Sequence, residues 1–197
     1  MHTEIEAKWL DVDHDELREK LKSIGAELVH TERLMARKIY DFPDARLNQT
    51  GGWARVRDEG DRVTMSYKQQ YDKSLHGTKE VNLTVDSFDE ADSFLLALGL
   101  VCKSTQETKR ESWKLGHVDI ELDTWPWIPP YVEIEAPSES ELTNTAKALG
   151  LTYEEGLPGA VSVAYRAVYH LEPGEVDSWE SIAFTPIPEW LEAKIKK

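Results

Sequence analysis

The chain has 197 residues, of which 40% are hydrophobic and 30% charged, and its formal net charge is −14. This composition suits a folded globular domain and excludes a disordered or fibrous chain. Proteins that bind nucleic-acid polymers use an excess of Lys and Arg to neutralise phosphates, so the net charge argues against such a partner.

The hydropathy of the chain gives no sign of a membrane segment. No apolar run approaches the roughly 20 residues that a membrane helix needs. The N-terminus also lacks the basic start and hydrophobic stretch of a signal peptide. We therefore expect a cytoplasmic protein, monomeric or homodimeric, that binds no membrane.

The first predicted strand carries its charges on one face. Side chains two residues apart in a strand point to the same side. The charged set is Glu4, Glu6 and Lys8, and the apolar set on the opposite face is Ile5, Ala7 and Trp9. A solvated sheet face would explain one such strand, but the pattern recurs along the chain.

A weak internal repeat of strand, capped helix and glycine runs through the sequence. In each repeat a Ser or Asp precedes an amphipathic stretch, and an acidic residue follows three positions later, as in a capping box. A glycine then supplies the left-handed residue that ends a helix. The predicted helices span residues 13–24, 87–98 and 138–149. A fourth stretch, residues 159–171, is compatible with a helix or a strand.

Strands with one polar and one apolar face lie between these helices. Residues 53–57 and 63–68 alternate in this way, and residues 58–61 between them predict a hairpin turn. Similar alternation flanks Gly116. The polar faces of all these strands carry Arg55, Arg57, Lys68, Arg110, Glu121, Asp123, Glu133 and Glu135.

An α+β fold accommodates these elements if the sheet curls. The apolar strand faces then bury against the helices outside, and the polar faces line a lumen. Closure of the sheet would also remove its exposed edges. The residues expected to pack against the helices are Trp9, Val81, Leu83, Val118, Ile120, Val132 and Ile134.

Taken in order, these motifs resemble those of the CYTH superfamily, the triphosphate tunnel metalloenzymes. The resemblance rests on Glu4-Ile5-Glu6-Ala7-Lys8, Ala54-Arg55-Val56-Arg57, Tyr67-Lys68, Lys109-Arg110, Leu122-Asp123-Thr124-Trp125-Pro126 and Tyr131-Val132-Glu133-Ile134-Glu135. It implies a closed eight-stranded antiparallel β-barrel over residues 1–171, whose tunnel binds a triphosphate with Mg²⁺ or Mn²⁺. Residues 172–197 are expected to pack on the barrel as a C-terminal extension.

The resemblance also implies roles for individual residues. The metal ligands it implies are Glu4, Glu6, Glu133, Glu135 and Asp123. The phosphate-binding residues it implies are Lys8, Arg55, Arg57, Lys68 and Arg110. Lys8, Glu121 and Asp123 are the expected catalytic residues, and spacing does not decide whether Glu121 or Asp123 is the acid near a second metal. Many relatives carry a middle acidic pair where this chain has Glu80 and Asn82, so a neutral amide replaces a carboxylate.

These residue types match the chemistry of a triphosphate. The planar guanidinium of arginine binds phosphate oxygens two at a time. Carboxylates packed together repel one another, which makes a divalent cation their natural occupant. We expect a metal-dependent enzyme that hydrolyses inorganic triphosphate or an organic triphosphate such as ATP or thiamine triphosphate. Two alternatives stay open: a class IV adenylyl cyclase that converts ATP to cyclic AMP and pyrophosphate, and a non-catalytic polyphosphate or nucleotide binding module.

Overall fold

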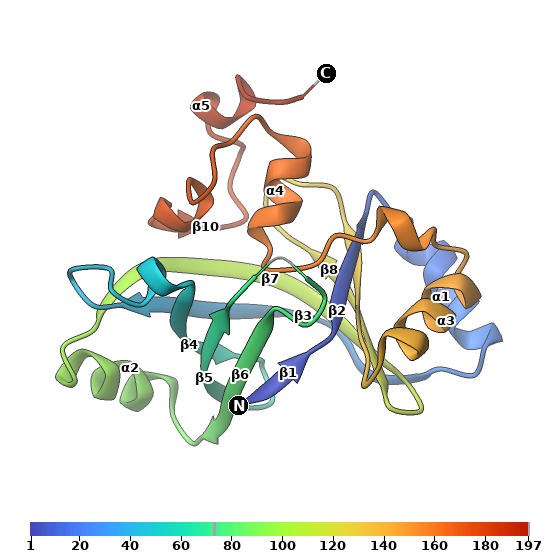
Figure 1. Cartoon of the computed structure of the whole chain (residues 1–197), viewed down its shortest axis with the longest axis horizontal. Coiled ribbons are helices and arrows are strands. Elements are labelled where there is room, and N and C mark those ends of the chain that lie inside the picture. The colour runs from blue at the N-terminus through green and yellow to red at the C-terminus, as the bar shows by residue number, and fades with distance from the viewer. Residues whose placement is uncertain (73, 197) are drawn as a thin grey trace.

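The computed structural model describes residues 1–72 and 74–196, apart from the side chains of His2 and Glu4. Within those residues the chain forms ten strands and five α-helices. The strands are β1 (His2–Glu4), β2 (Glu6–Leu10), β3 (Glu27–Asp41), β4 (Gly52–Asp58), β5 (Val63–Gln70), β6 (Thr78–Val85), β7 (Val101–Leu115), β8 (Val118–Thr124), β9 (Tyr131–Glu135) and β10 (Ser181–Ile182). The helices are α1 (His14–Ser23), α2 (Phe88–Ala97), α3 (Glu139–Ala148), α4 (Ser162–Val168) and α5 (Glu189–Glu192). Figure 1 shows a curved sheet with α1 and α3 together on one side, α2 on another, and α4, β10 and α5 above it.

Local sequence explains where the three longest helices begin and end. The residue before each helix accepts, through a side-chain oxygen, a backbone N–H from the first helical turn. These capping residues are Asp13, Ser87 and Ser138. Each helix is followed by a glycine with positive φ, which other residues adopt only at a steric cost: Gly25, Gly99 and Gly150. The three predicted helices are confirmed to within one residue at each end, whereas the stretch 159–171 forms only the short helix α4.

The strand order is β1-β6-β5-β4-β3-β7-β8-β9-β2, with antiparallel pairing between neighbours and β10 parallel to β7. The two ends of this order, β1 and β2, follow each other in the chain with Ile5 between them. They pair with different strands, since β1 pairs with β6 and β2 pairs with β9. Over the described residues the sheet is not closed by hydrogen bonds. The structure therefore shows an α+β fold with a curved antiparallel sheet, and does not show the predicted closed eight-stranded barrel.

A loop segment occupies the free edge of β2. Lys8 and Leu157 exchange backbone hydrogen bonds with N···O distances of 3.0 and 2.8 Å. Gly159 lies so close to β5 that a Cβ added to it would stand 2.8 Å from Nε2 of Gln70. Loop residues thus occupy the edge of β2 that would have to pair with another strand to close the sheet into a barrel.

The core lies between the outer face of the sheet and the helices. The buried strand residues beside α1 and α3 are Trp9, Val118, Ile120, Val132 and Ile134. A second cluster joins Tyr40 and Val56 to Leu95 of α2. The prediction is wrong for Val81 and Leu83, whose exposed fractions are 41% and 51%. Their strand, β6, lies beside the area that α2 covers, because α2 packs on β4, β5 and β7.

None of the described helices combines the length and the apolar character needed to cross a membrane.

Candidate active site

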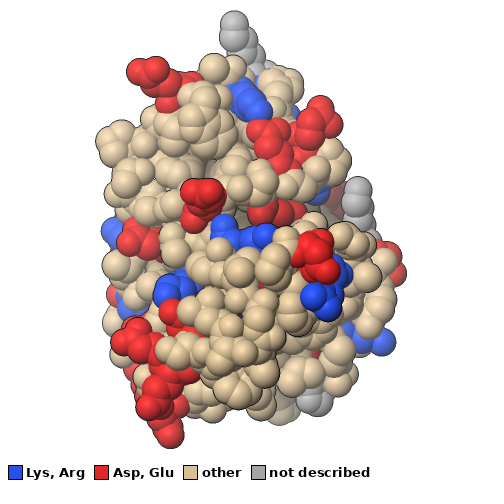
Figure 2. Space-filling model, turned by 90° about the vertical axis from the view of Figure 1, so that its left-hand side faces the viewer, with Lys and Arg blue, Asp and Glu red and all other residues tan. Residues whose placement is uncertain are grey.

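The inner face of the curved sheet lines a cavity of about 1440 Å³. Figure 2 shows one face of the molecule, on which Lys and Arg side chains lie near the middle with Asp and Glu beside them. The predicted site residues that line the cavity are Glu6, Lys8, Arg55, Arg57, Lys68, Arg110, Glu121, Glu133 and Glu135. Asp123 lies outside this lining and is completely buried, with an exposed fraction of 0%. The side chain of Glu4 lies outside the described residues.

Strand register brings distant charged residues onto one side of the cavity. On β2 and β9, Lys8 lies opposite Glu133. On β8, Glu121 lies opposite Glu133 as well. Directly opposed residues of neighbouring strands share a face, so these side chains meet. We call this side the ion-paired wall; its members are Glu6, Lys8, Arg110, Glu121, Glu133 and Glu135, and the buried Asp123 is paired with Arg110.

Lys8 is the buried cation at the centre of the ion-paired wall. Its Nζ lies 2.9 Å from Oε1 of Glu6 and 2.8 Å from Oε2 of Glu133. It also donates to the backbone carbonyl of Gly159 at 2.7 Å. Burial opposes the charged form, but the two carboxylates outweigh it and raise the pKa of Lys8. Lys8 is therefore held charged and in one position.

Arg110 joins the other half of this wall. Its guanidinium donates to both carboxylate oxygens of Asp123, with Nε 2.7 Å from Oδ1, and to Oε1 of Glu133 at 3.0 Å. Burial opposes ionisation of Glu133, but Lys8 and Arg110 together hold the pKa of its carboxyl well below its usual range. Glu133 is thus shared between two cations, and Asp123 acts on the cavity through Arg110.

Two carboxyl groups of the wall have the opposite character. Burial raises the pKa of Glu121 to about 7, although Arg110 offsets part of the effect. Burial is the larger cause, and repulsion from Glu6 and Glu133 the smaller, that raises the pKa of Glu135 to about 7. Among the described residues, Oε2 of Glu121 is also buried without a hydrogen-bond partner. Both groups would gain from a cation or a proton at their oxygens.

The opposite side of the cavity is basic. We call it the arginine wall; its members are Arg37, Arg55, Arg57 and Lys68, from β3, β4 and β5. Arg55 and Lys68 lie 3.3 and 3.7 Å from the carboxylate of Glu80. Arg57 donates through Nε to Glu59 at 2.9 Å. Burial opposes the charge of Glu59, but Arg57 and its neighbours outweigh it and lower the pKa of Glu59 to about 2.

Arg37 is the site residue that the sequence analysis missed. Its exposed fraction is 7%, and its Nε and Nη2 have no hydrogen-bond partner among the described residues. Burial, with Arg57, Arg55 and Arg110 nearby, lowers the pKa of Arg37. The ring of Trp125 lies 4.6 Å from its Cζ, in the geometry of a cation–π contact. A buried arginine with these neighbours indicates a place for an anion.

A family model described as the CYTH domain matches residues 2–168 of this chain. The chain belongs to the CYTH family. CYTH superfamily members include triphosphatases and adenylyl cyclases. A search of curated proteins finds no match to the chain.

Solved structures share the CYTH fold of this chain. The PH1012 protein of Pyrococcus horikoshii OT3 is 21% identical, with 82% of this chain and 98% of that chain covered and a TM-score of 0.68. A putative adenylate cyclase from Vibrio parahaemolyticus is 18% identical, with 84% and 98% covered and a TM-score of 0.70. The putative adenylyl cyclase HpAC1 from Hippeastrum, described as having a dominant triphosphatase activity, is 13% identical, with 83% and 95% covered and a TM-score of 0.59. At these identities the likeness shows the fold.

The carboxylates of this CYTH chain suit a divalent cation by donor type. Carboxylate oxygens are the ligands that Mg²⁺ and Mn²⁺ prefer. Oε2 of Glu121, which has no hydrogen-bond partner among the described residues and lies 3.9 Å from Nε of Arg110, fits such a group. No three His, Cys, Asp or Glu side chains of the described residues already stand in a metal-binding group. The oxygens of Glu133 are instead ion-paired with Lys8 and Arg110.

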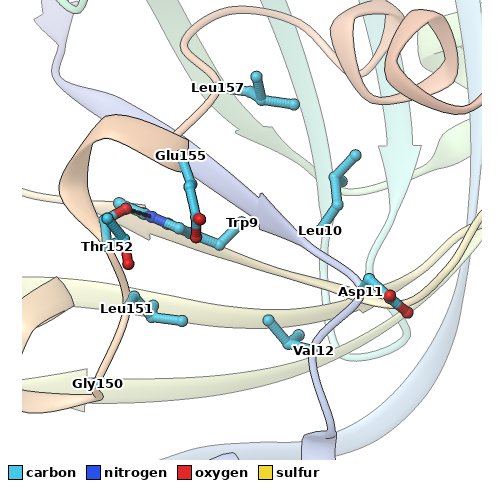
Figure 3. Close-up of a pocket in the computed structure, with 9 residues that line it drawn as sticks. All are labelled: Trp9, Leu10, Asp11, Val12, Gly150, Leu151, Thr152, Glu155 and Leu157. Atoms are coloured by element: carbon cyan, nitrogen blue, oxygen red, sulfur yellow. Dashed lines mark hydrogen bonds between the residues drawn. The ribbon is translucent and has the colours of Figure 1, made fainter.

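A second, smaller pocket of about 390 Å³ lies on the outside of the CYTH fold, between β2 and the chain that follows α3 (Figure 3). Trp9 forms its floor and donates through Nε1 to the carbonyl of Thr152 at 2.8 Å. The described residues that line it include Asp11 and Glu155 but neither Lys nor Arg. This pocket therefore lacks the groups that would bind phosphate.

Proposed function

We propose that this CYTH protein is a divalent-metal-dependent enzyme that hydrolyses inorganic triphosphate or the triphosphate group of a small organic molecule. The observation that carries the proposal is the pair of walls lining one cavity, with Nε and Nη2 of buried Arg37 lacking a hydrogen-bond partner among the described residues. A polyphosphate anion supplies acceptors for the Nε and Nη2 of Arg37, which have no hydrogen-bond partner among the described residues. A neutral or cationic substrate would leave the charge of Arg37 uncompensated.

Residues of the arginine wall bind the phosphate oxygens. The guanidinium groups of Arg37, Arg55 and Arg57 each present paired N–H donors that match phosphate oxygens. Lys68 adds a point charge on the neighbouring strand. Such groups, fixed before the substrate arrives, stabilise the charge that develops as a phosphoryl group is transferred.

Residues of the ion-paired wall handle the water and the metal. Bound Mg²⁺ or Mn²⁺, held by Glu4, Glu6, Glu133 and Glu135 with Asp123 nearby, would neutralise phosphate charge and polarise water. Glu121 is the candidate general base, because a carboxyl with a pKa of about 7 can accept a proton from water at neutral pH. The water oxygen bonds to the terminal phosphorus as the bridging P–O bond breaks. Orthophosphate and the shortened phosphate chain leave.

Release of phosphate tests this proposal directly. Purified protein is incubated with inorganic triphosphate, ATP or thiamine triphosphate, with Mg²⁺ or Mn²⁺, and orthophosphate is measured by a malachite-green assay. We expect release from at least one substrate, with inorganic triphosphate the first candidate because the site residues recognise phosphates. Protein that is folded by circular dichroism but inactive on every combination would contradict the proposal.

An adenylyl cyclase is the second candidate. Its support is the fold shared with the putative cyclase of Vibrio parahaemolyticus. In that reaction the 3′ hydroxyl of ATP attacks the α-phosphorus and pyrophosphate leaves. Detection of cyclic AMP by mass spectrometry, without orthophosphate, would favour the cyclase over the hydrolase. Tight binding of triphosphate in calorimetry without either product would instead indicate a non-catalytic binding module.

A further inference from the structure

The C-terminal segment, residues 172–196, lies beyond the part of the chain that the family model matches. Its strand β10 pairs in parallel with β7, through Ser181 opposite Thr105 and Ile182 opposite Gln106. Four of its apolar side chains are buried in a cluster with α4 and the loop between β8 and β9: Val176, Trp179, Ile182 and Leu191. The segment is thus built into the fold rather than laid loosely on it.

A line of aromatic rings connects this segment to the arginine wall. The ring of Trp179 lies 5.3 Å from that of Tyr165, edge to face at 87°. Tyr165 in turn lies 6.5 Å from Trp125, also at 87°. Trp125 is 3% exposed and covers the guanidinium of Arg37 at 4.6 Å. Such edge-to-face pairs are favourable arrangements that fix one ring against the next.

Hydrogen bonds hold the loop that carries Trp125. The hydroxyl of Tyr165 donates to the carbonyl of Pro126 at 2.8 Å, and that of Tyr169 donates to the carbonyl of Trp127. Nε1 of Trp127 donates to the carbonyl of Thr185 in the C-terminal segment at 2.8 Å. Trp127 has a φ of +66°, a left-handed conformation that persists in a non-glycine residue when its surroundings impose it. The position of Trp125 is therefore imposed by α4 and the C-terminal segment.

Arg37 needs such support because burial and the like charges around it oppose its own charge, an effect that Asp123 offsets only in part. Arg55, Arg57 and Arg110 carry the same charge as Arg37. The face of an indole ring is the most favourable aromatic partner for a cation. Nε1 of Trp125 is itself buried without a hydrogen-bond partner among the described residues. Two unpaired donor groups therefore lie side by side in the cavity lining.

We propose that the C-terminal segment is a positioning element, in which Trp179 and Tyr165 hold Trp125 so that its ring fixes Arg37 for phosphate binding. The role of Arg37 toward phosphate rests on the proposed function, whereas the position of Arg37 is measurable without any substrate. Trp125 and Trp179 are positioning residues in this scheme, and the segment sets the affinity of the cavity for a polyphosphate.

Two measurements on four variants test the proposal. The first is the Nε–Hε signal of Arg37 in ¹H–¹⁵N NMR spectra, assigned with Arg37→Lys, because the ring of Trp125 shifts the resonance of a guanidinium stacked on it. The second is the affinity for inorganic triphosphate by calorimetry without divalent metal, so that turnover does not contribute. The variants are Trp125→Leu, Trp125→Phe, Trp179→Leu and, as a control from the same segment, Phe184→Leu.

The expected pattern separates positioning from a structural role. Trp125→Leu loses the ring-shifted Arg37 signal and binds triphosphate roughly 3–30-fold more weakly, the range of a cation–π contact. Trp125→Phe restores a shifted signal and part of the affinity. Trp179→Leu moves both readouts in the same direction by a smaller factor, and Phe184→Leu leaves both unchanged.

Other results would overturn the proposal. A folded Trp179→Leu protein with the wild-type Arg37 signal and wild-type affinity shows that the segment does not position Arg37. If the leucine variant does not fold, Trp179→Phe replaces it, and an unchanged Arg37 signal there has the same meaning. Wild-type protein with the shifted Arg37 signal but no affinity for triphosphate supports the positioning and contradicts the proposed function.

Discussion

The two walls of the cavity handle buried charge in different ways. On the ion-paired wall, each cation is matched by carboxylates, as Lys8 is by Glu6 and Glu133. On the arginine wall, Arg37 has like charges beside it and an aromatic ring over it, with two nitrogens lacking a hydrogen-bond partner among the described residues. Both cations of one wall thus have carboxylate partners, whereas on the other wall Arg37 has two nitrogens available for an anion.

This difference between the walls predicts that substitutions on them affect folding stability and ligand binding differently. A buried ion pair costs several kcal/mol when one partner is removed, because the other charge is left uncompensated. An unmatched buried arginine already imposes such a cost on the folded state, so removing it relieves the fold. Substitutions on the ion-paired wall should therefore damage the fold and the activity together, whereas Arg37 should affect ligand binding while sparing the fold.

Lys8→Met should have the largest effect. It leaves Glu6 buried without its cation and Glu133 with Arg110 alone, which costs about 3–5 kcal/mol of unfolding free energy, and it lowers kcat/KM about 10³-fold. Urea unfolding and the phosphate-release assay measure the two effects. The control is Lys22→Met, because Lys22 pairs with Glu19 on the exposed face of α1 and should change stability by less than about 1 kcal/mol. Equal stability of the two variants would contradict the stabilising role of these ion pairs.

Arg37→Met should weaken ligand binding without lowering the stability of the fold, unlike Lys8→Met. We expect binding of inorganic triphosphate to weaken about 10²-fold, as for loss of a charge-assisted pair, while the unfolding free energy stays equal or rises. The physical reason is that methionine fills similar space without a buried charge. Calorimetry and urea unfolding give the two numbers. A loss of stability as large as that of Lys8→Met would show that the two walls do not differ.

Glu59→Gln tests the acid that supports the arginine wall. The pKa of Glu59 is about 2 in the folded protein against 4.5 unfolded, so its ionised form stabilises the fold above pH 4.5. That contribution is lost as pH falls from 4.5 towards 2. At pH 7 the variant should be less stable by on the order of 2–3 kcal/mol, and the difference from wild type should shrink steadily in acid. Glu19→Gln, on exposed α1, serves as control, and a gap independent of pH would refute this account.

Local chemistry in the sequence predicts the helices well. Capping residues and terminal glycines act over a few residues, so Ser87 and Gly99 suffice to bound α2. Strand alternation likewise predicts which residues of β4, β5 and β9 face the cavity. Pairing partners are different, because the meeting of Lys8 with Glu133 depends on the register of β2 against β9. Only the family resemblance, which joins the two motifs, suggested that they lie together.

The misses have physical causes. Alternation does not assign Arg37 because β3 is a long strand of mixed polarity whose pairing with β7 shifts register between Leu28 and His30 and again before Arg33. Each bulge breaks the period of two that identifies a strand face. Met35, Arg37 and Ile39 lie two residues apart and all line the cavity, but two of the three are apolar, so polarity does not mark this face of β3. Val81 and Leu83 alternate correctly, but alternation does not show whether a helix covers that part of the sheet.

The smallest predicted effect concerns Glu135, which is open to solvent within the cavity. Its pKa of about 7 lies above the 4.5 of the unfolded chain, so the folded protein holds more protons between these values and loses stability as pH rises through this window. Solvent screening keeps the contribution of this exposed group below about 1 kcal/mol. Glu135→Gln should flatten the slope of unfolding free energy against pH from pH 4.5 to 7 in metal-free buffer.

Mn²⁺ should flatten this slope in the wild type as well, because a cation favours the ionised carboxyl. Calorimetry in buffers of different ionisation enthalpy should then detect proton release. Identical slopes in wild type and variant, with no proton release on adding Mn²⁺, would remove Glu135 from the candidate metal ligands.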